Sequence, residues 1–203
     1  MATTSSVQHF SMIRSFQLAD LLTIANGCCG IGAVFRAMRF VEHHEPKHLY
    51  VAALLIPLAI VFDVLDGRVA RRRHQPSALG REMDSLADVI SFGVAPAAVA
   101  FALGLNSMLD QAMLTFFAVC GLSRLARYNI TAEQLAATAG KVTYFEGAPI
   151  PTSIVPLGIL VLAFRKGWLL PVHVAGLQLH AITLLFVLSG CLMISKTIHI
   201  PKP

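Results

Sequence analysis

Charged residues are scarce in this 203-residue sequence: Asp, Glu, Lys and Arg make up 13% of it, whereas about a quarter of a soluble domain is charged. Hydrophobic residues make up 56%, and the mean hydropathy is +0.68. A soluble chain of this size cannot hide so much apolar surface, because much of a small domain stays outside. We therefore expect an all-α integral membrane protein. The length suits about six membrane helices of about 20 residues, so residues 1–203 are predicted to form a single membrane-embedded domain.

Cysteine is also infrequent, and no CxxC pair occurs. Its four positions lie in apolar stretches, which favours buried small side chains over disulfides or zinc; they are Cys28, Cys29, Cys120 and Cys191. A secretory signal peptide is not evident in the first 17 residues, so the first membrane helix is expected to act as an uncleaved signal. Aromatic residues interleaved with Lys or Arg on a polar face, as single-strand binders need, are absent, and the net charge of +5 fits anionic lipid or a phosphate-bearing substrate better than nucleic acid.

Six apolar stretches predict membrane helices, near residues 18–38, 48–72, 81–105, 108–129, 150–168 and 178–197. Before them, residues 10–16 alternate apolar and polar side chains, which is typical either of a short interfacial helix or of a disordered tail. With both termini placed in the cytosol, eleven of the 16 Lys and Arg residues fall on the cytosolic side. This bias follows the positive-inside rule and supports that orientation.

Acidic residues gather where the second and third predicted helices meet. Asp63 and Asp66 are three residues apart on one helix face, and Asp84 and Asp88 are four apart on the next. A tight turn through Gly80 would bring the two faces together around one cavity. Carboxylates at membrane depth are costly unless they are paired or bind a cation. The alternative is a solvated cluster in which these acids pair with the arginines at 68, 71, 72, 73 and 81; Glu82, which matches neither face, is expected to be solvated or ion-paired.

Four crowded carboxylates repel one another unless a cation lies between them. Oxygen ligands favour hard ions such as Mg²⁺, Mn²⁺ or Ca²⁺, and two such ions can clamp a diphosphate during an in-line displacement. Gly67 and Gly80 would allow a bulky ligand to approach the backbone. Arg71, one turn after Gly67, can neutralise phosphate charge.

These residues fit the pattern D-x-x-D-G-x-x-A-R-x8-G-x3-D-x3-D without departure. The pattern resembles that of the CDP-alcohol phosphotransferases. The resemblance implies a six-helix membrane fold, a homodimer and a site open to the cytosol. It also implies that the four aspartates hold two divalent metals, Mg²⁺ or Mn²⁺, with Asp84 and Asp88 catalytic, and that Asp88 accepts the proton of the incoming alcohol. The same resemblance places Gly67, Ala70, Arg71 and Gly80 along the CDP pocket.

Further segments resemble the phosphatidylserine synthases of this family, at residues 91–96, 121–129 and 144–151, and the ends of the chain resemble the fungal form. The implied substrates are CDP-diacylglycerol and L-serine. The implied membrane is that of the endoplasmic reticulum. The fungal enzymes usually carry a longer amino-terminal extension, which this sequence lacks. Other acceptors in the same family, such as glycerol phosphate or inositol phosphate, remain alternatives, as does a headgroup transferred from CDP-choline.

The acceptor pocket has candidates outside the motif. Arg124 and Arg127, three residues apart, can hold a carboxylate, or they can snorkel toward lipid headgroups. Glu146 can bind an ammonium group and Asn129 can add a polar contact, although such residues are more often simply solvated. Asn26, with Thr23 on the same helix, can face the phosphates or can bond a neighbouring helix.

Two other interpretations are weaker. His43, His44 and His48 lie in the predicted link on the side away from the acids, so a solvated loop is favoured over a zinc site. A small cation transporter could use the acidic cluster as its ion site. Transporters, however, usually place such groups near the midplane in both halves of a repeat, and no internal repeat is evident here.

Overall fold

The computed structural model describes residues 18–72, 78–137, 144–174, 177–195 and 199–201. The interfacial helix predicted for residues 10–16 lies outside this part. The helices are α1 (Leu18–His43), α2 (Pro46–Arg72), α3 (Ala78–Asp88), the π-helix η2 (Val89–Val94), α4 (Ala95–Ala102), α5 (Met108–Ala137), the 3-10 helix η3 (Ile150–Ser153), α6 (Ile154–Arg165) and α7 (Thr183–Ile194). The strands are β1 (Tyr144–Glu146), β2 (Pro171–Val174), β3 (Leu177–His180) and β4 (His199–Pro201).

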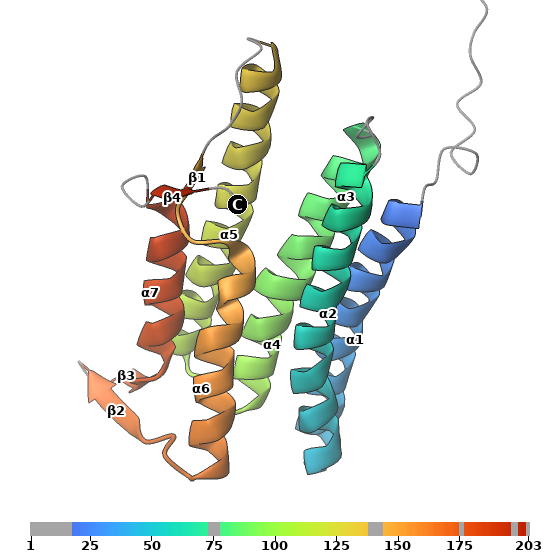
Figure 1. The fold of residues 1–203 in the computed structure, drawn as a ribbon. Helices are drawn as coiled ribbons and strands as arrows, with labels where there is room; N and C mark the ends of the chain where they lie inside the picture. Colours follow the sequence, from blue (N-terminus) through green and yellow to red (C-terminus); the bar gives the residue numbers. More distant parts are fainter. Residues whose placement is uncertain (1–17, 73–77, 138–143, 175–176, 196–198, 202–203) are drawn as a thin grey trace, which may run out of the picture.

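The helices run roughly side by side as an elongated bundle, with β1 and β4 at one end and β2 and β3 at the other (Figure 1). Among the residues that the structure describes, three segments are long and apolar enough to cross a membrane: Leu18–His43, Pro46–Ala70 and Leu79–Ala102. The third combines α3, η2 and α4 without a break. Within the described part, Ile150–Arg165 and Thr183–Ile194 are shorter apolar helices. The six predicted stretches are therefore helical for most of their length, and three of them meet the requirements for a span.

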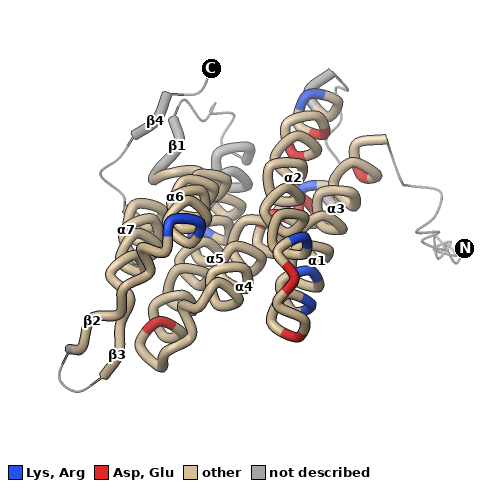
Figure 2. Tube along the Cα trace, turned by 90° about the horizontal axis from the view of Figure 1, so that it is seen from below, with Lys and Arg blue, Asp and Glu red and all other residues tan. Residues whose placement is uncertain are grey.

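The outer surface of the bundle is apolar, as lipid contact requires. Phe35, Met38, Leu54 and Leu86 each expose more than 60% of their surface, and exposed apolar area on this scale is unusual for a soluble monomer. Figure 2 shows most of the charged residues on α1, α2 and α3, while α4 and α7 contain none.

Small residues form the contact between α1 and α2. Ala33, Ala37, Ala52 and Ala59 are almost completely buried, so the two backbones approach closely, as helices do in membranes. Pro57 lies inside α2, where membrane helices tolerate proline. The packing of α1 against α2 fixes the position of α2, which carries Asp63 and Asp66.

The helical content agrees with the predicted all-α class, but short strands also occur and one predicted helix boundary is corrected. Two antiparallel two-stranded sheets occur, β1 with β4 and β2 with β3, and the helix predicted to begin at residue 178 begins at Thr183 instead. The reason lies at His180, whose backbone N–H donates to Asp110 Oδ1 at 3.1 Å and whose Nδ1 lies 2.7 Å from Asp110 Oδ2. These bonds hold residues 177–180 against the start of α5 as a strand.

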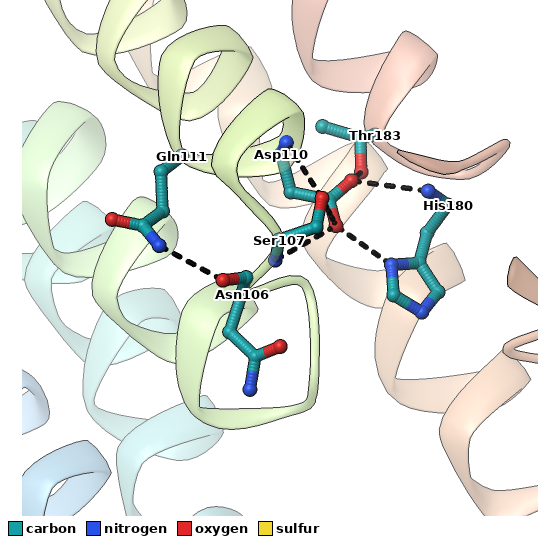
Figure 3. A network of polar contacts seen from close by, with 6 residues as sticks. All are labelled: Asn106, Ser107, Asp110, Gln111, His180 and Thr183. Carbon is teal, nitrogen blue, oxygen red and sulfur yellow. Dashed lines mark hydrogen bonds and ion pairs between the residues drawn. The ribbon is translucent and has the colours of Figure 1, made fainter. Parts of the chain in front are cut away.

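Asp110 is fully buried and joins three elements (Figure 3). Thr183 at the start of α7 donates to Asp110 Oδ1 at 2.6 Å, and the Ser107 hydroxyl donates to Oδ2 at 2.7 Å. Asp110 N–H donates back to Ser107 Oγ at 3.1 Å, which completes a capping box. Asp110 was not among the residues predicted from the sequence, although the Ser-x-x-Asp spacing before an apolar helix was the available signal.

Two further expectations are corrected. Gly80 lies in the first turn of α3, so it does not form the turn between α2 and α3; the connection falls at residues 73–77, outside the described part. All four cysteines are free, as predicted, but only Cys29 and Cys120 are buried, whereas Cys28 and Cys191 are exposed on the apolar surface.

Candidate active site

Three of the four motif carboxylates of α2 and α3 meet, and the fourth, Asp88, lies outside this group. One oxygen from each of Asp63, Asp66 and Asp84 lies within 4.8 Å of the others. Asp66 is buried, and Asp63 and Asp84 are half-buried. Among the described residues this is the only group of three His, Cys, Asp or Glu side chains close enough to share a metal ion. An all-oxygen set of this kind suits Mg²⁺ or Mn²⁺.

Thr23 of α1 fixes the orientation of Asp66. Its hydroxyl donates to Asp66 Oδ2 at 2.8 Å and lies 3.2 Å from the Ala19 carbonyl. Both Thr23 and Asp66 are buried. A hydrogen-bonded neighbour of this kind orients a metal-binding carboxylate and restricts its rotation.

Asp88, the fourth acid of the motif, lies beside α1. Asn26 donates through Nδ2 to Asp88 Oδ1 at 3.0 Å, and both side chains are buried. The π-helix η2 begins at the next residue, and its Ser91 hydroxyl donates to the Asn26 carbonyl at 2.9 Å. A Cβ on Gly30 would lie 2.5 Å from Ser91 Oγ, so glycine is required for this close contact. Short π segments frequently occur at functional sites, and here one follows the proposed base directly.

Several polar atoms around these acids are buried and have no hydrogen-bond partner among the described residues. They include Asp84 Oδ1, Asn26 Oδ1 and Arg124 Nε. Buried polar atoms are normally paired, since leaving one unpaired costs about 1–3 kcal/mol. Two acceptors and one donor are therefore available to a cation or a polar ligand. A metal ion bound at this site would give Asp84 Oδ1 the partner that it lacks among the described residues.

The two arginines of α5 have different surroundings. Arg124 is 7% exposed, and its charge interacts favourably with Asp88. Arg127 is half-buried and donates through both terminal nitrogens to the Ile194 carbonyl, at 3.3 and 3.2 Å. The structure therefore brings Arg124 toward the aspartates, while the guanidinium of Arg127 binds the end of α7.

Asn129 connects α5 to α3. It exchanges hydrogen bonds with Ser85, at 2.9 and 3.3 Å, and donates to Glu82 Oε2 at 3.3 Å. Glu82 is exposed and lies 3.9 Å from Arg81, which agrees with the expectation of a solvated or ion-paired residue. Ser85 was missed because a serine next to Asp84 carries no signal of its own. The bond shows that Asn129 lies beside the acidic helix.

The remaining residues of the motif are placed as follows. A Cβ on Gly67 would meet nothing within 4 Å, so open space lies next to the backbone of α2 there. Ala70 is half-buried one turn later, and Gly80 lies in the first turn of α3. Arg71 ends the same turn of α2, and Glu146 ends β1; the side chains of these two residues lie outside the described part.

The histidines between α1 and α2 do not form a metal group. His43 and His44 are exposed, as a solvated link requires, whereas His48 is buried and its Nδ1 lies 3.3 Å from Arg36. Glu45 lies 3.4 Å from His48 Nε2. The prediction of a solvated loop is therefore correct except at His48, which packs inside the helix pair.

Comparison with known sequences agrees with this geometry. The profile of the CDP-alcohol phosphatidyltransferase family matches residues 16–196. A CDP-diacylglycerol–serine O-phosphatidyltransferase of Saccharomyces cerevisiae is 44% identical over 98% of this chain and 76% of its own. Relatives of the same name from Mycobacterium leprae and Bacillus subtilis are 37% and 32% identical over 74% and 78% of this chain. The alignment covers 49% of the Mycobacterium protein and 82% of the Bacillus protein.

Proposed function

This chain belongs to the CDP-alcohol phosphatidyltransferase family, and on that premise we propose that it transfers the phosphatidyl group of CDP-diacylglycerol to the hydroxyl of L-serine, giving phosphatidylserine and CMP. The structural observation that carries the proposal is the meeting of Asp63, Asp66 and Asp84 within 4.8 Å. The choice of serine is supported by the names of the relatives from a fungus and two bacteria. It is also supported by the buried cation of Arg124 near Asp88.

The acidic group has the composition and spacing of a divalent metal site. We assign Asp63, Asp66, Asp84 and Asp88 as ligands for two ions, Mg²⁺ or Mn²⁺. When bound, such ions supply positive charge that stabilises the diphosphate and the departing phosphate oxygen. The unpartnered Asp84 Oδ1 and the Thr23 bond to Asp66 support this assignment.

In the proposed reaction the serine oxygen attacks the phosphorus that bears the lipid. The new O–P bond forms as the P–O bond to CMP breaks, so CMP leaves with that oxygen. The proton of the serine hydroxyl passes to Asp88. Asn26 holds Asp88 through Oδ1 and so orients the carboxylate for this transfer, since a base must lie within hydrogen-bond reach of the proton that it accepts.

The nucleotide is proposed to lie over the end of α2 and the start of α3. The open space at Gly67 lets a ligand reach the backbone. Ala70 and Gly80 are small residues, so they leave room for the ligand beside it. Arg71 supplies positive charge for the diphosphate. Asn26 Oδ1, which has no partner among the described residues, can accept a hydrogen bond from the ligand.

The acceptor serine is proposed to lie on the α5 side of the aspartates. Arg124 would bind its carboxylate, since the guanidinium Nε is buried and has no partner in the described part of the chain. Glu146 would bind the ammonium group, and Asn129, which donates to Ser85, would add a further polar side chain to the pocket. Arg127 is proposed to contribute indirectly, because its guanidinium already binds Ile194.

The membrane arrangement is part of the same proposal. Three spans satisfy length and composition, and α5, α6 and α7 would complete a six-helix transmembrane domain. We propose that the aspartates face the cytosol, as the positive-inside bias suggests, and that the chain forms a homodimer in the endoplasmic reticulum membrane. The homodimer is what the family resemblance implies, and the endoplasmic reticulum is what the resemblance to the fungal form implies.

The direct test uses purified protein with CDP-diacylglycerol, labelled serine and Mn²⁺. We expect labelled phosphatidylserine and an equal amount of CMP, both lost on adding EDTA and restored by Mn²⁺ or Mg²⁺. A parallel panel replaces serine with glycerol phosphate or inositol phosphate. CMP release with one of these and not with serine would keep the chemistry and overturn the choice of acceptor.

A further inference from the structure

The segment that carries Glu146 is held by the end of α7 and by β4. β1 pairs antiparallel with β4, in the register Tyr144 with Pro201 and Glu146 with His199. Figure 1 shows the two strands together at the end of the bundle where α7 finishes. Residues 144–146 are thus bound on one side by a strand more than 50 positions later in the sequence.

Beyond β1 the same segment is fixed to the last turn of α7. Ala148 N–H donates to the Leu192 carbonyl at 3.0 Å. Gly147 has a φ of 74°, and a Cβ there would lie 2.3 Å from the Met193 carbonyl oxygen. Only glycine combines this backbone conformation with so close a contact. The position of the segment 144–149 therefore depends on the position of the last turn of α7.

Arg127 connects α5 to the same helix end. Both of its terminal nitrogens donate to the carbonyl of Ile194, the last residue of α7. The final carbonyls of a helix lack partners within it, so a guanidinium with two N–H groups is well suited to bind one. Arg127 is three residues from Arg124 on α5. A short chain of contacts thus runs from α5 through the end of α7 to residues 147 and 148.

The segment continues into η3, which packs against α5 near Arg124. A Cβ on Gly121 would lie 2.8 Å from Ile150 Cδ1, and Gly121 is three residues before Arg124. Residues 147–150 are therefore bound to α7 through Ala148 and contact α5 through Ile150, one helix turn before the buried Arg124.

We propose that Arg127 is a positioning residue that sets the affinity for the acceptor alcohol, by holding the end of α7 and through it the segment 144–149. This inference rests on the proposed function and adds to it a structural determinant outside the metal site. Arg127 acts through Ile194, Leu192 and Ala148 and does not contact the acceptor. The strand pair β1–β4 supports the same segment from its other edge.

The test compares Arg127→Ala, Arg127→Lys and a variant lacking residues 199–203, with Arg39→Ala as the control. Arg39 is an exposed arginine that bonds His43 at the far end of α1. In Arg127→Ala we expect KM for serine to rise about tenfold, which corresponds to one lost positioning contact, with kcat and KM for CDP-diacylglycerol changed less than twofold. Arg127→Lys, which offers one donor nitrogen in place of two, should fall between wild type and Arg127→Ala. The strand deletion should raise KM for serine in the same direction.

Hydrogen exchange measured on the same proteins needs no substrate, so it separates this proposal from the proposed reaction. The amide of Ala148 should exchange faster in Arg127→Ala than in wild type and Arg39→Ala. Unchanged exchange at Ala148 would overturn the positioning role whatever reaction the protein performs. Faster exchange with unchanged KM for serine would overturn the link to the acceptor. Absence of phosphatidylserine synthesis by the wild type would instead refute the proposed function.

Discussion

Asn26 and Asp88 lie 62 residues apart in the sequence and are joined by a 3.0 Å hydrogen bond inside the bundle. Asn26 is fully buried, and its backbone carbonyl is bound in turn by Ser91. The amide therefore has a fixed position and can determine which way the Asp88 carboxylate points. The proposed base owes its orientation to a helix that contributes none of the motif residues.

We predict that Asn26→Leu lowers kcat by about 10- to 100-fold, the range found when a group that orients an active-site carboxylate is removed. Leucine has the same number and branching of side-chain heavy atoms as asparagine but cannot donate to Asp88. The rate of labelled phosphatidylserine formation at saturating serine measures the effect. Asn106→Leu, at an exposed asparagine before α5, is the matched control and should retain wild-type kcat. A fully active Asn26→Leu enzyme would remove Asn26 from the mechanism.

Thr23→Val tests the metal site without removing a carboxylate. Valine keeps the shape of threonine but cannot donate to Asp66 Oδ2, a bond of 2.8 Å. We expect the Mn²⁺ concentration that gives half-maximal activity to rise about tenfold or more, because the orienting neighbour is lost. At saturating Mn²⁺ most of the rate should return.

Thr115→Val is the control for Thr23→Val. Thr115 is exposed on α5 and bonds only to the Gln111 carbonyl among the described residues. Its metal requirement should equal that of wild type. If both valine variants reach half-maximal activity at the same Mn²⁺ concentration, the hydrogen bond from Thr23 to Asp66 does not contribute to metal binding.

Asp110→Asn is predicted to destabilise the fold without affecting the chemistry. The carboxylate accepts hydrogen bonds from Ser107, His180 and Thr183. The NH₂ group of an asparagine side chain would face these N–H and O–H donors, so at least one of the hydrogen bonds would be lost. Breaking such a buried network costs about 3–5 kcal/mol, which lowers Tm by on the order of 10 °C in a chain of this size. Thermal unfolding in detergent measures the shift, and Gln111→Ala, at an exposed neighbour, should show little change. A Tm equal to wild type would contradict the structural role.

The sequence predicted the aspartates that meet on α2 and α3, but it did not predict which residues of α1 orient the acids of the motif. Asp63 and Asp66 lie together because a spacing of three residues places side chains on one helix face, and that rule is local. Asp84 joins them from α3 because α2 and α3 lie side by side, as the acidic cluster at their connection led us to expect. Thr23 and Asn26 were noticed only as polar residues on an apolar helix, with helix–helix bonding as an equal explanation; the structure shows that both bind acids of the motif. Which helix α1 packs against depends on tertiary contacts such as Gly30 with Ser91, which no local spacing specifies.

The same distinction explains the errors. Residues 177–180 are apolar enough to continue the last predicted helix, but they form a strand because His180 binds Asp110, 70 positions earlier. Arg127 was grouped with Arg124 by helical spacing. Its partner is a backbone carbonyl 67 residues away, and a carbonyl carries no side-chain signal in the sequence.

A glycine pair provides a final test of where the nucleotide binds. A Cβ would meet no protein atom within 4 Å at either Gly67 or Gly158, so alanine should be accommodated at both positions, and it removes the helix penalty of glycine. Gly67 lies between the aspartates of α2 and Arg71, whereas Gly158 is exposed on α6. If the open space at Gly67 receives the CDP group, Gly67→Ala should raise KM for CDP-diacylglycerol about tenfold while the protein remains as stable as wild type. Gly158→Ala should leave KM unchanged. Equal KM values in the two variants would show that the ligand does not approach α2 at this point, and the nucleotide would then have to bind elsewhere along the acidic face.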